Sequence, residues 1–100
     1  MPVQPKSWGY IYIIRSLNRY KIGYTGNLKT MERRLAVLST LNAYGIDKVL
    51  ILRSRRAHNL EVQLHRQFQH IRVNGEWFEL TLEDVECIKQ RYTKELFEVY

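Results

Sequence analysis

The sequence predicts a mixed α/β (α+β) fold built on a small sheet, and three observations lead to this class. The chain has 100 residues, which is the size of one compact domain. Its composition, 45% hydrophobic and 26% charged, is typical of a globular protein. Short aromatic and β-branched runs alternate with segments of helical periodicity, giving the order β-β-α-β-α-(β)-α.

The first two strands are expected to pair as a hairpin. Residues 1–8 contain two prolines and are predicted to form a flexible leader. Residues 9–15 are rich in aromatic and β-branched side chains, which favours a buried strand. Residues 20–24 form a second strand, and the short turn between the two favours antiparallel pairing.

Two amphipathic helices and a third strand follow. Residues 28–41 carry apolar side chains at every third or fourth position, and either Thr25 or Asn27 can cap this helix. Residues 48–53 predict a short central strand. Residues 57–70 repeat the helical period and predict the second helix.

The last part of the chain is expected to end in an acidic C-terminal helix. Residues 76–80 predict a brief extended segment in which Trp77 and Phe78 are core anchors. Residues 81–84, Thr-Leu-Glu-Asp, have the pattern of a capping box, so the helix should begin there. Residues 9–100 are therefore predicted to form a single domain.

Charge is unevenly distributed along the chain, whose net charge is +6. Residues 1–75 hold 13 Lys and Arg against three acids, a charge of +10, and residues 76–100 hold three against seven, a charge of −4. A basic body of this density suits a polyanion, of which nucleic acid is the commonest in cells. A solvated basic surface without a partner is the alternative. Glu61 is one of the three acids in that body.

Several classes of protein are excluded by what the sequence lacks. The longest apolar run, residues 10–14, is too short to cross a membrane, and the first residues have no apolar core of a signal peptide. The single Cys87 permits neither an internal disulfide nor a cysteine-rich zinc site. No glycine-rich phosphate loop or serine elbow is present. We expect a soluble, cytoplasmic protein, with nucleoid association left open.

A series of short motifs runs through the chain in order. They are Tyr-Ile-Tyr at 10–12, Lys-Ile-Gly at 21–23, Glu-Arg-Arg-Leu at 32–35, a helical glutamate at 61, and Gly-Glu-Trp-Phe at 75–78. This series resembles the GIY-YIG nuclease superfamily, and most of all its compact phage and bacterial branch with KIG in place of YIG. The resemblance implies a mostly antiparallel three-stranded sheet flanked by helices, and a metal-dependent endonuclease that hydrolyses DNA.

The resemblance also implies roles for single residues. Tyr12 matches the tyrosine of the first motif and would be the general base, while Gly23 matches the glycine of the second. Arg34, or Arg33 one register step away, would clamp the scissile phosphate. Glu61 would hold one Mg²⁺ or Mn²⁺, since a single glutamate does not support a two-metal cluster.

Further residues are candidates beside these four. Lys21 is expected to lower the pKa of Tyr12 from its usual value of about 10. His65, one turn after Glu61, would orient the metal's water or contact phosphate, and a structural histidine is the alternative. Asn74 matches an asparagine that often follows the glutamate in this superfamily, although a turn residue needs no function. A basic rim that contacts backbone phosphates without sequence readout is predicted at Arg53, Arg55 and Arg56.

The main hypothesis is therefore a divalent-metal-dependent DNA endonuclease with no membrane contact. Because the chain has little room for a separate DNA-binding domain, it is expected to cut with little sequence preference, to act as a homodimer or to be delivered by a partner protein. The alternative is a non-catalytic DNA-binding module of the same fold, which departures from the superfamily pattern at Tyr10, Lys21 and Leu38 support. A third hypothesis, a protein-interaction module, rests on an apolar patch in the C-terminal helix (Leu96, Phe97, Val99 and Tyr100).

Overall fold

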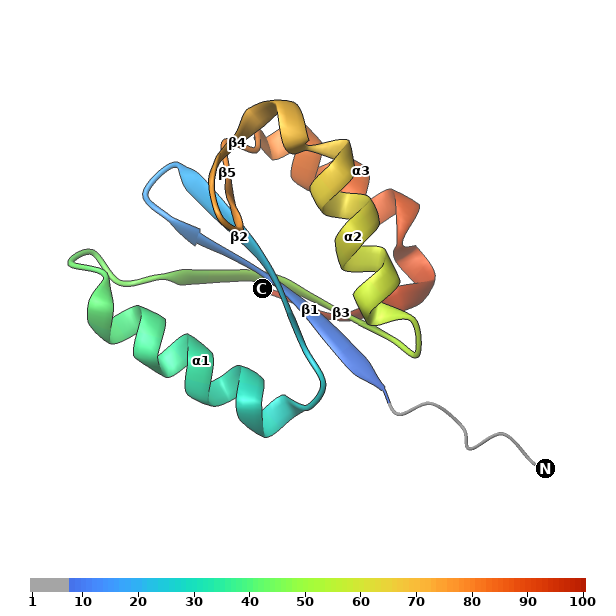
Figure 1. The fold of residues 1–100 in the computed structure, drawn as a ribbon, viewed down its shortest axis with the longest axis horizontal. Helices are drawn as coiled ribbons and strands as arrows, with labels where there is room; N and C mark the ends of the chain where they lie inside the picture. Colours follow the sequence, from blue (N-terminus) through green and yellow to red (C-terminus); the bar gives the residue numbers. More distant parts are fainter. Residues whose placement is uncertain (1–7) are drawn as a thin grey trace.

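The computed structural model describes residues 8–100, and within them an antiparallel sheet is flanked by three helices (Figure 1). The leader predicted at residues 1–8 lies outside the described residues except for Trp8. In chain order the elements are β1 (Gly9–Ser16), β2 (Arg19–Thr25), α1 (Leu28–Leu41), β3 (Asp47–Ser54), α2 (Ala57–Gln67), a 3-10 turn (Gln69–Ile71), β4 (Arg72–Asn74), β5 (Trp77–Phe78), α3 (Leu82–Arg91), a second 3-10 turn (Thr93–Glu95) and β6 (Leu96–Val99).

The sheet has six strands in the order β4-β5-β2-β1-β3-β6, and each neighbouring pair is antiparallel. In this register Tyr12 of β1 lies opposite Gly23 of β2 on one side and Ile51 of β3 on the other. Successive residues of a strand face opposite sides of the sheet. The side chains of β1 are therefore divided between the two faces, with Tyr12 on one and its neighbours Ile11 and Ile13 on the other.

Each face of the sheet has its own hydrophobic core. Helices α2 and α3 cover one face, where Ile11, Leu64 and Phe78 are fully buried (Figure 1). Helix α1 covers the opposite face with Met31 and Leu35. The two cores fix α1 and α2 on opposite sides of the same strands, so side chains from both helices can meet only at an edge of the sheet.

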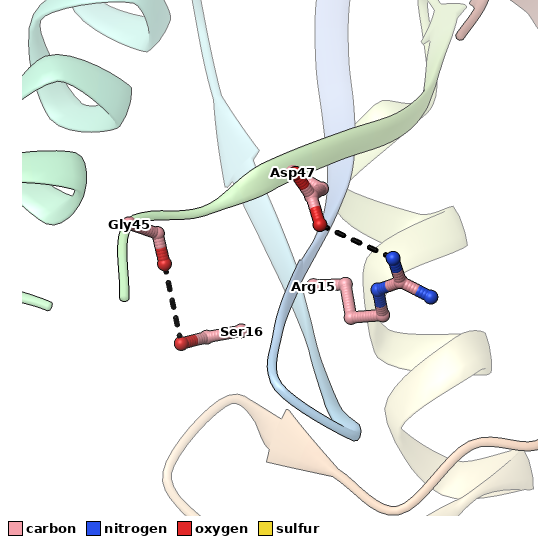
Figure 2. A network of polar contacts seen from close by, with 4 residues as sticks. All are labelled: Arg15, Ser16, Gly45 and Asp47. Carbon is pink, nitrogen blue, oxygen red and sulfur yellow. Dashed lines mark hydrogen bonds and ion pairs between the residues drawn. The ribbon is translucent and has the colours of Figure 1, made fainter. Parts of the chain in front are cut away.

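Polar contacts hold the β1–β2 hairpin to the start of β3 (Figure 2). Arg15 Nη2 donates to Asp47 Oδ2 at 3.1 Å, and Ser16 Oγ donates to the carbonyl oxygen of Gly45 at 3.4 Å. Both members of the ion pair are largely exposed, so the pair contributes little to stability. Gly45 has φ +71°, which lets the chain turn here before β3 begins.

The fold class predicted from the sequence is confirmed, and so are several local predictions. Helix α1 has the predicted bounds, with Asn27 as the capping residue. The capping box of α3 is formed by both reciprocal hydrogen bonds between Thr81 and Asp84, at 2.9 and 3.1 Å. The second predicted helix ends at Gln67, where a 3-10 turn takes over.

Two predictions about the fold were wrong. The sheet has six strands instead of three, because β4, β5 and β6 are only two to four residues long and carry no clear alternating pattern. The predicted last helix is present as α3, but it ends at Arg91, and the residues of the expected apolar patch follow it in β6 beside β3. As alternate strand residues, Leu96 packs against the α2 side and Phe97 against the α1 side. Leu96 and Phe97 are therefore partly buried, whereas Val99 and Tyr100 remain exposed, so half of the expected apolar patch lies on the surface.

None of the helices within residues 8–100 is both long and apolar enough to cross a membrane.

Candidate functional site

The candidate site lies where the edge of β2 has no neighbouring strand. Strand β5 pairs only with Tyr20 and Lys21, so the next residues of β2 need other hydrogen-bond partners. The Ile22 amide donates to the Glu76 carbonyl at 3.0 Å, and the Ile22 carbonyl accepts from His65 Nε2 at 2.9 Å. Three elements therefore meet at this edge: β2 itself, the turn before β5, and α2.

Helix α1 reaches the same edge from the other face of the sheet. Arg34 Nη1 donates to the Tyr24 carbonyl at 2.8 Å, two residues further along β2. This bond uses one of the five N–H groups of the guanidinium, and a hydrogen bond to Tyr12 uses another. The side chain is exposed, so its remaining donors can bind a phosphate.

Tyr12 approaches the edge by lying across Gly23. The two residues are opposite each other in the β1–β2 register, and a Cβ atom on Gly23 would overlap the Tyr12 ring. Only glycine leaves room for the ring in this position, although its backbone angles are those of an ordinary strand residue. Tyr12 is 2% exposed, and its ionisation responds to Glu76, Arg34 and Glu61, so the hydroxyl lies among these charged groups.

Glu61, His65 and Glu76 form a compact acid–imidazole cluster at this edge. Each offers one ligand atom, and these atoms all lie within 4.8 Å of one another. Glu61 and His65 are four residues apart on α2 and therefore share one face of the helix. All three side chains are half-buried.

The orientation of the His65 ring is fixed by two contacts. A carbonyl oxygen can only accept, so the 2.9 Å contact to Ile22 requires the proton on Nε2. The Phe78 ring packs edge-on against the imidazole, with ring centroids 5.0 Å apart. In the neutral ring Nδ1 is therefore the nitrogen whose lone pair is free for a ligand.

Burial and like charge act together on the acids of this edge. Burial, followed by the charge of Glu76, raises the pKa of Glu61 above its ordinary value of 4.5, while His65, His58 and Arg34 pull it down. Burial and then Glu76 also raise the pKa of Tyr12, against a hydrogen bond from Arg34 and its positive charge. Both groups are thus held where their charged forms are disfavoured, as is common at functional sites.

The effect of Lys21 on the pKa of Tyr12 that the sequence predicts was wrong. Lys21 lies opposite Ile14 in the hairpin register, and its ammonium sits 5.9 Å from the centre of the Trp77 ring. Lys21 is not among the groups that shift the pKa of Tyr12, which is raised and not lowered. The positive group that favours ionisation of Tyr12 is Arg34.

A groove between α1 and β2 adjoins Tyr12 and has a volume of about 460 Å³. Lys21, Arg33 and Arg34 line it together with Tyr12. Arg33 is therefore next to the site without belonging to the cluster. Of the two arginines that the sequence left open, Arg34 is the one that reaches the edge of β2.

The remaining predicted residues lie outside the cluster. Asn74 is in β4 and lines a separate recess with Trp77. Arg53 stacks between the rings of Trp8 and Phe97, at 4.6 and 4.8 Å, and Arg55 also lies over Trp8 at 4.8 Å. Arg56 lines a second recess at the start of α2.

Glu76 is the site residue that the sequence reasoning missed. The sequence reasoning counted it among the acids of residues 76–100. In the structure, the turn before β5 brings its carboxylate close to Glu61. A usable signal was present, because Glu76 stands inside the Gly-Glu-Trp-Phe motif at 75–78 and follows the turn at Gly75, whose φ is +49°.

A comparison with protein families gives a match to the T5orf172 domain over residues 9–99. No curated protein and no solved structure matches the chain. The match overturns the GIY-YIG assignment made from the motif series, because it points to a different family.

Proposed function

Because the chain belongs to the T5orf172 domain family, whose members are nuclease-like, DNA-interacting domains, we propose that it is a divalent-metal-dependent endonuclease that hydrolyses the phosphodiester bonds of DNA. One observation carries this proposal: Glu61, His65 and Glu76 gather within 4.8 Å beside Tyr12 and Arg34 at the open edge of β2. A surface that only binds phosphate has no use for two carboxylates at its centre, because they repel the ligand.

The donor set fits one divalent cation. Two carboxylates and an imidazole with a free Nδ1 are ligands that Mg²⁺ and Mn²⁺ accept, and the nitrogen ligand favours Mn²⁺. The proposal extends the expectation from the sequence, which gave the ion Glu61 as its single protein ligand. The ion would supply Lewis-acid polarisation of a phosphoryl oxygen.

Arg34 would bind the scissile phosphate. Its bond to the Tyr24 carbonyl fixes one nitrogen, and the planar fork of the guanidinium keeps further N–H groups for a phosphate. Negative charge accumulates on the phosphoryl oxygens as the bond breaks, so a fixed cation there stabilises the transition state more than the ground state.

The state of Tyr12 supports a role different from the general base expected from the sequence. Burial and the charge of Glu76 raise its pKa, so the phenol is protonated at neutral pH. A protonated phenol cannot take a proton from water, but it can hold the attacking water or the phosphate by a hydrogen bond. We assign Tyr12 this positioning role, with Gly23 providing the space for its ring.

The direct test incubates the purified protein with supercoiled plasmid and Mn²⁺ or Mg²⁺, beside Glu61→Gln, the matched control Glu32→Gln and an EDTA control. Glu32 is an exposed acid of α1 outside the cluster. Nicking that needs the metal, disappears in Glu61→Gln and survives in Glu32→Gln is the expected result.

Tight, salt-sensitive binding with no cleavage under either metal would overturn the proposal in favour of a non-catalytic DNA-binding module. The family match supports interaction with DNA and does not favour this alternative over the nuclease. We further propose that the protein acts as a homodimer or with a targeting partner protein, and sedimentation of the same samples tests the first of these.

A further inference from the structure

A second recess lies beside the cluster, between the start of β1, the end of β2 and the start of α2. Its volume is about 360 Å³. Trp8, Tyr24, Arg55, Arg56 and His58 contribute its main side chains, and no acid lines it. The wall is therefore aromatic and cationic, in contrast to the acid-containing cluster next to it.

Arg55, one of the two arginines that stack on the Trp8 ring, is held in place without an acidic partner. Arg55 lies over the indole at 4.8 Å, on a ring that also stacks against Arg53 at 4.6 Å. Stacking uses the flat face of a guanidinium and leaves its N–H edge free. Within residues 8–100 neither Arg55 nor Arg56 forms an ion pair. Their positive charges are thus concentrated at the recess with no protein anion to balance them.

The recess and the cluster are adjacent along two elements. His58 of the recess precedes Glu61 by three residues on α2, a rise of about 4.5 Å along the helix axis. The Tyr24 ring packs edge-on against His58 at 5.5 Å, while the Tyr24 carbonyl holds Arg34. These shared elements place the recess beside the site at which Arg34 would hold a phosphate.

We propose that this recess binds the backbone phosphate next to the scissile one, through Arg55 and Arg56. This inference rests on the proposed function for the identity of the substrate. It narrows the substrate class to a nucleic-acid strand that continues past the cleaved bond, because a phosphodiester with a single phosphate leaves the recess empty. It also assigns Arg55 and Arg56, two residues of the basic rim predicted from the sequence, to one specific phosphate.

The test compares a fluorescein-labelled DNA oligonucleotide with bis(p-nitrophenyl) phosphate, a diester that carries one phosphate only. In the double variant Arg55→Ala/Arg56→Ala, the ratio of kcat/KM for the oligonucleotide to kcat/KM for the small diester should fall at least severalfold. The matched control is Arg91→Ala: Arg91 also stacks on an aromatic ring, Tyr92, but it contacts Gln67 at the opposite end of α2. In that control the ratio should stay at the wild-type value.

A binding measurement keeps the inference separate from cleavage. In the Glu61→Gln background, the double variant should bind the oligonucleotide more weakly, and the slope of log K against log salt should shrink by about 0.7–0.9 for each phosphate that the variant no longer neutralises. An unchanged slope together with an unchanged substrate ratio would overturn the recess as a phosphate site. If the wild type cleaves neither substrate but the slope still shrinks, the recess stands and the proposed nuclease activity fails.

Discussion

Two polar clusters of this molecule show opposite electrostatic arrangements. At the hairpin end of the sheet, Arg15 pairs with Asp47, both are largely exposed, and opposite charges face each other (Figure 2). At the open edge of β2, Glu61 and Glu76 are half-buried and close together, and the charge of Glu76 raises the pKa of Glu61. The first arrangement is what folding alone produces. The second costs stability in the absence of a cation, and such local cost is typical of a site kept for a ligand.

The largest effect in this comparison is expected from the two arginines. Arg34→Gln should lower the rate of plasmid nicking by about 10²–10³, the usual effect of removing one donor that stabilises transition-state charge. Arg15→Gln should leave the rate unchanged, because its ion pair stands apart from the site. The measurement is the initial rate under single-turnover conditions. Equal effects of the two substitutions would remove the distinction between the clusters.

Glycine substitutions give the next test, on the approach of Tyr12 to the edge. Gly23→Ala should destabilise the protein by about 1–3 kcal/mol, as overpacking does, and reduce nicking, because the new methyl group occupies the space of the Tyr12 ring. Gly26→Ala is the matched control for the unfolding measurement, since a Cβ there meets open space. Urea unfolding and nicking assays on both variants test this. A harmless Gly23→Ala would show that Tyr12 does not need its observed position.

How far the sequence could predict this molecule depends on the range of each contact. Helix α1 and the capping box at Thr81 depend on residues within a few positions of one another, and both were predicted. Strand β6 is four residues long and forms its hydrogen bonds with β3, more than 40 residues earlier. No local sequence pattern could therefore predict it.

The candidate site followed the same division. Tyr12, Arg34 and Glu61 were proposed from the motif series, and the structure brings them to one edge. Glu76 was missed because it reaches Glu61 only through the pairing of β5 with β2. The effect of Lys21 was misjudged because Lys21, on the strand next to Tyr12, was expected to lie near the Tyr12 hydroxyl. Its ammonium lies over the Trp77 ring instead.

A smaller effect concerns stability without metal. Since the pKa of Glu61 is raised in the folded state, the carboxylate is less favourable there than in the unfolded chain at neutral pH. Glu61→Gln should therefore raise Tm by a few degrees in EDTA, and Mn²⁺ should stabilise the wild type but not the variant. Asp47→Asn should show neither behaviour. Thermal melts of the three proteins with and without Mn²⁺ provide the data, and a lower Tm for Glu61→Gln in EDTA would contradict the comparison.

The smallest effect is the pH dependence of that difference. A raised pKa means that the folded state binds the proton more tightly, so the stability it contributes is present below pH 4.5 and is lost as pH rises through the folded value. The Tm advantage of Glu61→Gln should therefore shrink as pH falls toward 4.5. Melts at several pH values in EDTA measure it, and an advantage that grows on acidification would reverse the assigned sign.

The most direct test of the central claim is calorimetric titration of the protein with Mn²⁺. We expect one ion per chain in the wild type, a large loss of affinity in Glu76→Gln, and wild-type affinity in the control Glu79→Gln, whose exposed carboxylate lies near Arg19 instead. Glu76 is the informative position because only the structure places it with Glu61 and His65. Unchanged Mn²⁺ affinity in Glu76→Gln would contradict the cation site and, with it, the proposed chemistry of this edge.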